Sequence, residues 1–227
     1  MKYNHIVFDI DGTLIDTEKA MLLSLQEALY QLQGKKYNLE DLRFTFGIPD
    51  DDSMKRLKVQ DADSCERLWA KFKPEYTHTI KIFDGMNSTL YKLKSKGISL
   101  GIITSRTREE FTNDFVPFGI AEFFDIAICA DDTGKHKPNP EPMLKYLELS
   151  KANKKTTLYI GDTVYDFDCA HSAGVDFALA LWGGKSSKSF DPTFLLDRPQ
   201  SILNILNEDN YCRKCGQKVV HCTGSMN

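Results

Sequence analysis

Two aspartates that follow a short apolar run near the N-terminus are the first residues that could carry out chemistry together. Residues 6–8, Ile-Val-Phe, favour a buried strand, and Asp9, Asp11 and Gly12 follow directly. Gly12 allows a sharp bend that could direct both carboxylates into one crevice. The segment could be a solvated loop. Alternatively, Asp9 is a nucleophile, Asp11 transfers a proton, and a bound Mg²⁺ relieves the repulsion between the two carboxylates.

An alternation of strand-like and helix-like segments predicts the framework that would position these carboxylates. From residue 82 onward, apolar runs alternate with segments of helical spacing. This order favours an α/β fold, with a doubly wound parallel sheet and helices on both of its faces. In such a fold, ligands bind beyond the carboxyl ends of the strands. Besides residues 6–8, we expect strands at residues 98–104, 126–130, 157–160 and 177–180, the last of them being the final strand of the core.

Residues 18–81 contain only helical patterns, and we expect them to form a small unit without strands. A long insertion behind an active-site strand is more often a functional lid than an idle loop. The sequence therefore predicts a helical unit that serves the site. Its apolar residues recur at helical spacing in four segments, at residues 21–32, 39–44, 54–57 and 65–72.

Composition and charge exclude several classes of protein. The chain has 227 residues, of which 41% are hydrophobic, enough for one substantial core and a small accessory domain. The net charge of −3 gives no electrostatic reason to expect nucleic acid or an anionic membrane as a partner. No stretch is long and apolar enough to span a bilayer. The six cysteines do not form a disulfide framework. We therefore expect a soluble cytoplasmic protein.

A hydroxyl group marks the end of the next predicted strand. Thr104 closes an apolar run and is followed by Ser105 and Arg106. The Thr104 side chain could simply cap the following helix. In the functional interpretation, Thr104 donates a hydrogen bond to a phosphoryl oxygen, and backbone N–H groups at the start of the helix assist it.

A lysine in a proline-rich run is a further candidate. Residues 135–142 read Lys-His-Lys-Pro-Asn-Pro-Glu-Pro, and three prolines in so short a run restrict the backbone. A lysine held there could offset the charge of the nucleophile and of a transferred phosphoryl group. The alternative is a solvated basic loop before a helix.

Two more acids follow the strand predicted at residues 157–160. Asp162 and Asp166 could complete the oxygen shell of a Mg²⁺ ion, with Asp162 as the direct ligand. The alternative is that they only cap the helix that follows, since acids are favourable near a helix N-terminus.

Together these segments resemble the motifs of the haloacid dehalogenase superfamily of phosphotransferases. The resemblance extends over residues 4–206, and every motif falls at a predicted strand end, in the order that the family has. The helical insertion stands where the helical-cap branch of the family, with its phosphoglycolate phosphatase-like members, has its cap. The four similar segments are residues 9–17, Thr104, Lys137 with Pro138, and residues 161–175.

The resemblance implies the division of the chain and a metal site. It predicts a core domain of residues 1–17 and 82–206, a helical cap of residues 18–81, and a tail of residues 207–227. It also implies that Mg²⁺ is held by carboxylates at strand ends. The implied ligands are Asp9, the main-chain carbonyl of Asp11, and Asp162, while Asp166 either binds through water or orients Lys137.

The resemblance further implies a reaction. Asp9 attacks phosphorus to form an aspartyl-phosphate, and Asp11 protonates the leaving group and then activates water. Thr104 and Lys137 would stabilise the phosphoryl oxygens. Thr104, with Ser105, Arg106 and the cap residue Gly47, would contact the substrate.

The implied activity is that of a phosphatase acting on a small phosphorylated metabolite, of the phosphoglycolate kind. A phosphomutase of the β-phosphoglucomutase type shares the catalytic motifs, and a pyrophosphatase is also compatible with them. A non-catalytic protein that binds a phosphorylated ligand would have the same fold. We expect the protein to act as a monomer or a homodimer.

The last predicted site lies in the tail. Cys212 and Cys215 have the spacing of a zinc knuckle, and His221 and Cys222 could supply further ligands for a structural Zn²⁺ ion. The alternative is a chain end with incidental thiols.

Overall fold

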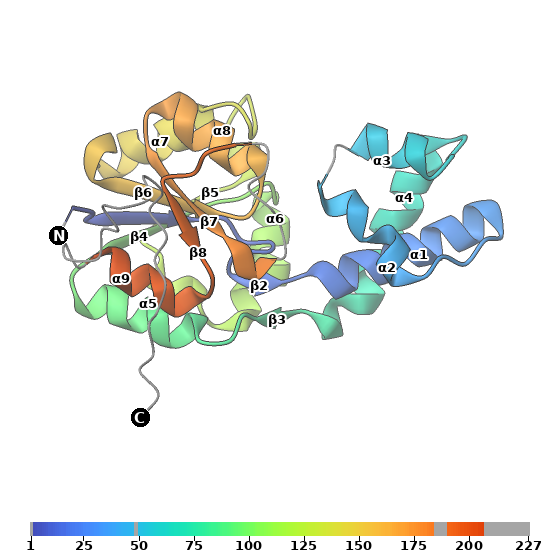
Figure 1. Ribbon diagram of the computed structural model, residues 1–227, viewed down its shortest axis with the longest axis horizontal. Coiled ribbons are helices and arrows are strands. Elements are labelled where there is room, and N and C mark those ends of the chain that lie inside the picture. The colour runs from blue at the N-terminus through green and yellow to red at the C-terminus, as the bar shows by residue number, and fades with distance from the viewer. Residues whose placement is uncertain (1, 48–49, 184–189, 207–227) are drawn as a thin grey trace. The chain divides into compact units, whose positions relative to one another are not determined.

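The computed structural model describes residues 2–47, 50–183 and 190–206 and divides the chain into two compact units (Figure 1). One unit contains the chain up to Ile15 and from Ile82 onward, and the other comprises Asp16–Lys81. The chain passes between the units at two short strands, β2 (Ile15–Asp16) and β3 (Lys81–Ile82), which pair with each other. No helix among the described residues combines the length and the apolar character needed to cross a membrane.

A six-stranded parallel sheet forms the centre of the first unit. The strands are ordered β5-β4-β1-β6-β7-β8, so β1 lies between β4 and β6. The central strands are buried on both faces, which agrees with their nearly continuous apolar sequences. The strands are β1 (His5–Phe8), β4 (Ser99–Ile103), β5 (Ile126–Ile128), β6 (Thr157–Gly161), β7 (Asp176–Ala180) and β8 (Phe194–Leu196).

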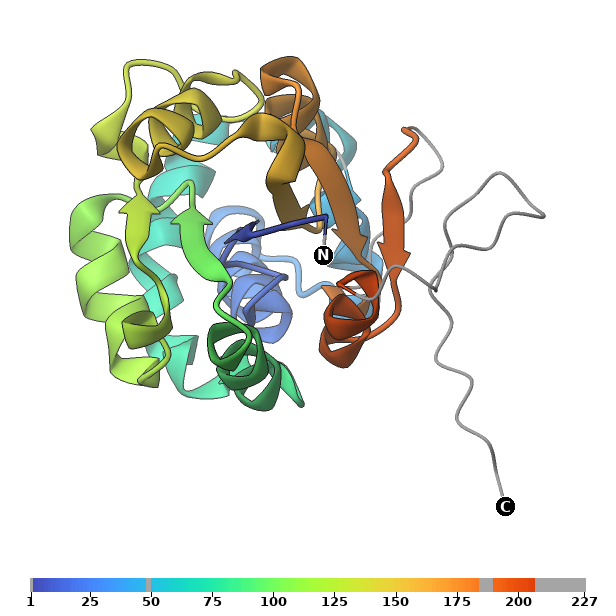
Figure 2. The same ribbon diagram turned by 90° about the vertical axis from the view of Figure 1, so that its left-hand side faces the viewer.

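Helices cover both faces of this sheet (Figure 2). On one face, α7 (Glu141–Ser150) and α8 (Val164–Ala173) pack against each other and against the sheet. On the other face, α5 (Met86–Ser95) packs against α9 (Ile202–Ile205). The short helix α6 (Arg108–Glu110) follows β4 and continues as a π-helical turn, Phe111–Phe115. The predicted α/β class with a doubly wound parallel sheet is confirmed.

The prediction that residues 177–180 are the final strand is wrong. β8 follows β7 and pairs with it in parallel, with Ala178 opposite Phe194. The strand is a short run, Phe-Leu-Leu, and it lacks the β-branched residues that marked the run at residues 6–8 as a strand. Burial of Phe194 and Leu196 against the sheet stabilises it instead.

The second unit is a small helical assembly with its own core. Helix α1 packs against α4, and the indole Nε1 of Trp69 in α4 donates to the carbonyl of Met21, 3.1 Å away, and to Oγ of Ser24, 2.9 Å away. Its core residues include Leu25, Leu29 and others from all four helices. The expectation of no strand in residues 18–81 is wrong at its last residue, because Lys81 pairs in β3. The helices are α1 (Glu18–Gln33), α2 (Leu39–Leu42), α3 (Asp50–Arg56) and α4 (Ala62–Phe72), with 3-10 turns at Arg43–Gly47 and Lys73–Thr79.

Candidate active site

Asp9 stands at the carboxyl end of the central strand β1. Its backbone N–H donates to the carbonyl of Ile160 in β6 at 2.9 Å, which continues the ladder one residue beyond the strand. The residue is 5% exposed. Because Phe8 is level with Ile102 of β4 and with Ile160, the ends of three neighbouring strands meet beside the Asp9 carboxylate.

A tight turn after Asp9 brings the chain close to a second carboxylate. The backbone N–H groups of Thr13, Leu14 and Ile15 all point to the carbonyl of Ile10. Gly12 has φ +80°, in the left-handed region, and a Cβ atom there would lie 2.4 Å from Oδ2 of Asp162. Glycine is therefore required at this position by both its backbone conformation and its distance from the Asp162 carboxylate.

Lys137 forms ion pairs with the carboxylates of Asp9 and Asp166. Its Nζ lies 2.6 Å from Oδ1 of Asp9 and 2.7 Å from Oδ1 of Asp166. The three side chains are 7%, 8% and 1% exposed for Lys137, Asp9 and Asp166. Since a buried charge is tolerated only when it is paired, this lysine can hold the Asp9 carboxylate in a fixed orientation.

The carboxylate of Asp166 is fully engaged in hydrogen bonds. Oδ1 accepts from Lys137 and lies 3.0 Å from the hydroxyl of Tyr159, and Oδ2 accepts from the N–H and the hydroxyl of Thr163 at 3.0 and 2.6 Å. A carboxylate offers about four lone-pair sites, and Lys137 and Thr163 occupy three of them, with the Tyr159 hydroxyl close to the fourth. The arrangement favours the role of orienting Lys137 over that of binding a metal ion directly.

Two residues in this network, Tyr159 and Thr163, escaped the sequence analysis. Thr163 and Asp166 form a capping box at the start of α8, and the spacing of this pair could have predicted it. The Tyr159 hydroxyl also lies 3.2 Å from the carbonyl of Ile103. The only signal for Tyr159 was a hydroxyl in an otherwise apolar strand.

The charges in the cluster act strongly on one another. Burial raises the pKa of Asp9 to about 8, the positive charge of Lys137 opposes this shift, and the carboxylates of Asp166 and Asp162 add to it. Burial disfavours the charged form of Lys137, but the carboxylates of Asp166 and Asp9 outweigh this effect, so the pKa of Lys137 is raised. For Asp166, burial is outweighed by Lys137 and by its hydrogen bonds, so the pKa of Asp166 is lowered.

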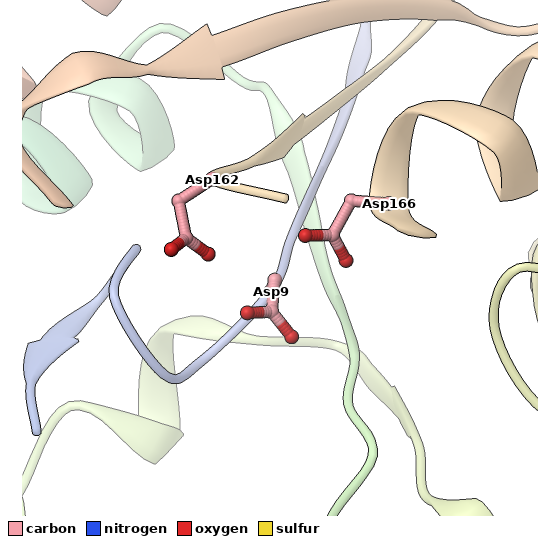
Figure 3. A group of neighbouring side chains, drawn as sticks. All are labelled: Asp9, Asp162 and Asp166. Atoms are coloured by element: carbon pink, nitrogen blue, oxygen red, sulfur yellow. The ribbon is translucent and has the colours of Figure 1, made fainter. Parts of the chain in front are cut away.

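The acidic cluster fits a divalent cation. Asp9, Asp162 and Asp166 are all buried, and each offers an oxygen atom within 4.8 Å of the others (Figure 3). They come from the end of β1, the end of β6 and the first turn of α8 (Figure 3). Lys137 balances one of the three negative charges, and an ion such as Mg²⁺, which prefers oxygen ligands, would balance the other two.

Asp11 and Thr104 both form hydrogen bonds with Arg106. The Arg106 guanidinium binds both oxygens of Asp11, with two contacts of 2.8 Å. The backbone N–H of Arg106 donates to Oγ1 of Thr104 at 3.2 Å, which leaves the Thr104 hydroxyl proton available to another acceptor. Thr104 is 4% exposed, and Ser105 beside it is exposed.

Gly47 and the predicted zinc ligands are not among the residues described for this site. Gly47 ends the 3-10 turn Arg43–Gly47 and belongs to the helical unit, whereas the residues described above belong to the first unit. The predicted zinc ligands Cys212, Cys215, His221 and Cys222 lie outside the described residues.

Comparisons with known proteins agree with the geometry. Residues 6–180 match the family model described as haloacid dehalogenase-like hydrolase. Pyrophosphatase PpaX of Halalkalibacterium halodurans is 32% identical over 213 residues, 91% of this chain and 98% of that protein. A Lactobacillus plantarum structure assigned as a phosphoglycolate phosphatase is 30% identical, with a TM-score of 0.80 over 90% of this chain and 100% of that one.

A second similar structure, a Thermotoga maritima protein assigned as a β-phosphoglucomutase, is 24% identical and shows the likeness of the fold. Its TM-score is 0.69, and it covers 91% of this chain and 99% of that one. The family model spans the sheet from β1 to the end of β7, and the PpaX relative matches over nearly its whole length. The chain is therefore an enzyme that belongs to the haloacid dehalogenase-like hydrolase family.

Proposed function

We propose that the protein is a Mg²⁺-dependent phosphatase that transfers a phosphoryl group to Asp9. The observation that carries this proposal is the environment of Asp9, a buried strand-end carboxylate held by Lys137 at 2.6 Å beside a cluster that fits a divalent cation. Asp9, Asp162 and the main-chain carbonyl of Asp11 would hold the ion. Bound there, Mg²⁺ would neutralise the charge of the attacking carboxylate and of the phosphoryl oxygens.

The residues then divide the reaction into two steps. In the first, an oxygen of Asp9 bonds to phosphorus and the bond from phosphorus to the leaving oxygen breaks. That oxygen takes a proton from Asp11, which must be protonated for this step and therefore released from its ion pair with Arg106. In the second, water bonds to phosphorus, the bond to Asp9 breaks, and the proton of the water returns to Asp11. Thr104 and Lys137 donate hydrogen bonds to the phosphoryl oxygens in both steps.

The substrate proposed for this site is a small phosphorylated compound. The PpaX relative is named for pyrophosphate, and the Lactobacillus plantarum structure is assigned to phosphoglycolate, so these two compounds are the first to test. The same first step would serve a phosphomutase. A mutase would interconvert sugar phosphates without releasing phosphate, and the assay for phosphate release separates the two activities.

The test of the proposed function is the Asp9→Asn variant. Its neutral amide is a poor nucleophile, so we expect phosphate release to fall by at least roughly 10³-fold with a panel of phosphorylated metabolites and Mg²⁺. Removal of metal by EDTA should abolish the activity, and Mg²⁺ should restore it. Asp191→Asn, at an exposed position of the same unit, is the matched control and should retain activity. Full activity of Asp9→Asn, or undiminished activity in EDTA, contradicts the proposal.

A further inference from the structure

Arg106 holds the carboxylate of Asp11 by two equal contacts, although the two residues are far apart in the chain. Nε donates to Oδ2 and Nη2 donates to Oδ1, each at 2.8 Å, and Nη1 lies 3.5 Å from Oδ2 of Asp114. The Arg106 side chain is 15% exposed, and the Asp11 side chain is 40% exposed. A paired contact of this kind is strong and fixes the orientation of both groups.

The guanidinium therefore lies next to the carboxylate that would protonate a leaving group. Asp11 must reach the leaving oxygen in the proposed mechanism, and Arg106 is bound directly to Asp11. The same turn carries Thr104, whose Oγ1 accepts from the N–H of Arg106. Asp11 uses two of the five N–H donors of Arg106 and a third points toward Asp114, so further donors are available for a ligand.

We propose that Arg106 contacts the leaving group and selects substrates in which that group carries its own negative charge. Such substrates are pyrophosphate, in which the leaving group is a second phosphate, and phosphate esters in which the carbon that bears the ester oxygen also carries a carboxylate. This inference rests on the proposed function and names the substrate class of the same site.

The selectivity follows from the chemistry of the guanidinium. A phosphate or a carboxylate can accept two parallel N–H bonds from an arginine, as the Asp11 carboxylate already does. A neutral alcohol accepts one weaker bond and gains little from the positive charge. Because the side chain is mostly buried, water screens this difference less than it would at the surface.

Orientation of Asp11 is the competing role for Arg106. A residue that only positions Asp11 would affect every substrate that needs a proton, whatever the charge of its leaving group. The two roles therefore predict different ratios of kcat/KM between two matched substrates, one with a charged and one with a neutral leaving group. Overall activity does not separate them.

Phosphoglycolate and 2-hydroxyethyl phosphate form such a matched pair, since a carboxylate in the first replaces a neutral hydroxymethyl group in the second. We expect Arg106→Gln to lower kcat/KM for phosphoglycolate and for pyrophosphate by roughly 30- to 100-fold. The loss for 2-hydroxyethyl phosphate should stay below roughly fivefold. Arg106→Lys keeps the charge without the fork, so its losses on the two charged substrates should be intermediate.

Arg108→Gln is the matched control. Arg108 lies in the same segment, but its guanidinium binds Asp132 and the carbonyl of Ala127 instead of Asp11. This variant should leave the ratio between the two matched substrates unchanged. Thermal unfolding of all variants identifies any that fail to fold.

Binding provides a readout that does not depend on turnover. With Mg²⁺ present, calorimetry should show that Arg106→Gln weakens binding of methylenediphosphonate at least roughly tenfold and leaves that of methylphosphonate unchanged. Equal effects on both compounds, or equal losses on the matched substrates, would overturn the inference.

If wild-type protein releases phosphate but the ratios do not change, the inference fails and the proposed function stands. If the binding difference is found without turnover, the proposed function fails and the anion contact stands.

Discussion

Asp9 is the proposed nucleophile, and its surroundings oppose its ionisation. It lies in a buried cluster with two other carboxylates, and burial raises the pKa of Asp9 to about 8 although Lys137 opposes the shift. A nucleophile must be ionised to attack phosphorus. At the residue scale, the cation that fits the cluster and Lys137 would therefore act together, because both favour the charged form of Asp9.

This shift predicts how the stability of the metal-free protein depends on pH. Between about 4 and 8, Asp9 is protonated in the folded state and ionised in the unfolded state, so the folded state binds more protons. The contribution of Asp9 to stability is therefore present at low pH and is lost as the pH rises toward 8. The Asp9→Asn variant has no titratable group at this position. In EDTA, its free energy of unfolding should therefore increase relative to that of the wild type as the pH rises.

Thermal or urea unfolding of both proteins at several pH values between 4 and 8 measures this difference. The comparison cancels the contributions of groups remote from the cluster, whereas Asp166 and Lys137 interact with Asp9 directly and contribute to the difference. Added Mg²⁺ should stabilise the wild type more at pH 8 than at pH 5, because the ion competes with the proton for Asp9. A difference between the two proteins that does not change with pH would show that Asp9 is ionised throughout.

At the element scale, the site depends on how closely the turn after β1 approaches the end of β6. Gly12 permits this approach, because a side chain there would meet the Asp162 carboxylate at 2.4 Å. Gly161, the last residue of β6, has the same relation to Asp166, where a Cβ atom would lie 2.5 Å from Cβ of that residue. The carboxylates are thus positioned by backbone segments that tolerate no side chain between them.

Gly12→Ala tests this packing. The substitution should displace Asp162 and lower kcat/KM by about 10²-fold, as expected for a misplacement near 1 Å in an active site. Gly97→Ala is the matched control, because Gly97 has a similar φ of +75° and nothing within 4 Å of its Cβ position. The control should lose about 1 kcal/mol of unfolding free energy through backbone strain and keep its activity. Equal activity of the two variants would show that Asp162 can move without loss of function.

At the scale of the whole molecule, the chain joins its two compact units through the paired strands β2 and β3. A site that admits a substrate and then excludes water needs a part that moves. We predict that the helical unit is this part, with hinges near residues 16–18 and 79–84.

Hydrogen exchange with and without methylenediphosphonate and Mg²⁺ measures this movement. The ligand should change the exchange of backbone amides in residues 18–81, and Mg²⁺ alone serves as the control. Equal protection of these residues in all samples would contradict the prediction.

Features that depend on residues close together in the chain could be predicted from the sequence. Apolar runs predicted the strands that precede Asp9 and Asp162 and the strand that ends with Thr104, and helical spacing predicted the helical unit of residues 18–81. Because the ends of parallel strands meet at one edge of a sheet, the order of these segments was enough to bring their polar residues together. The family resemblance could be found in the sequence because it also rests on the order of these motifs along the chain.

Which of these groups pair with one another depends on how the elements pack in the fold. Asp11 and Arg106 are 95 positions apart, and no local pattern predicts that one binds the other. The structure also places Nζ of Lys137 beside Asp166, and it added the short strand β8, which pairs with its neighbour β7. Contacts of this kind depend on the distance and direction of side chains from separate elements, and these are fixed only when the elements pack.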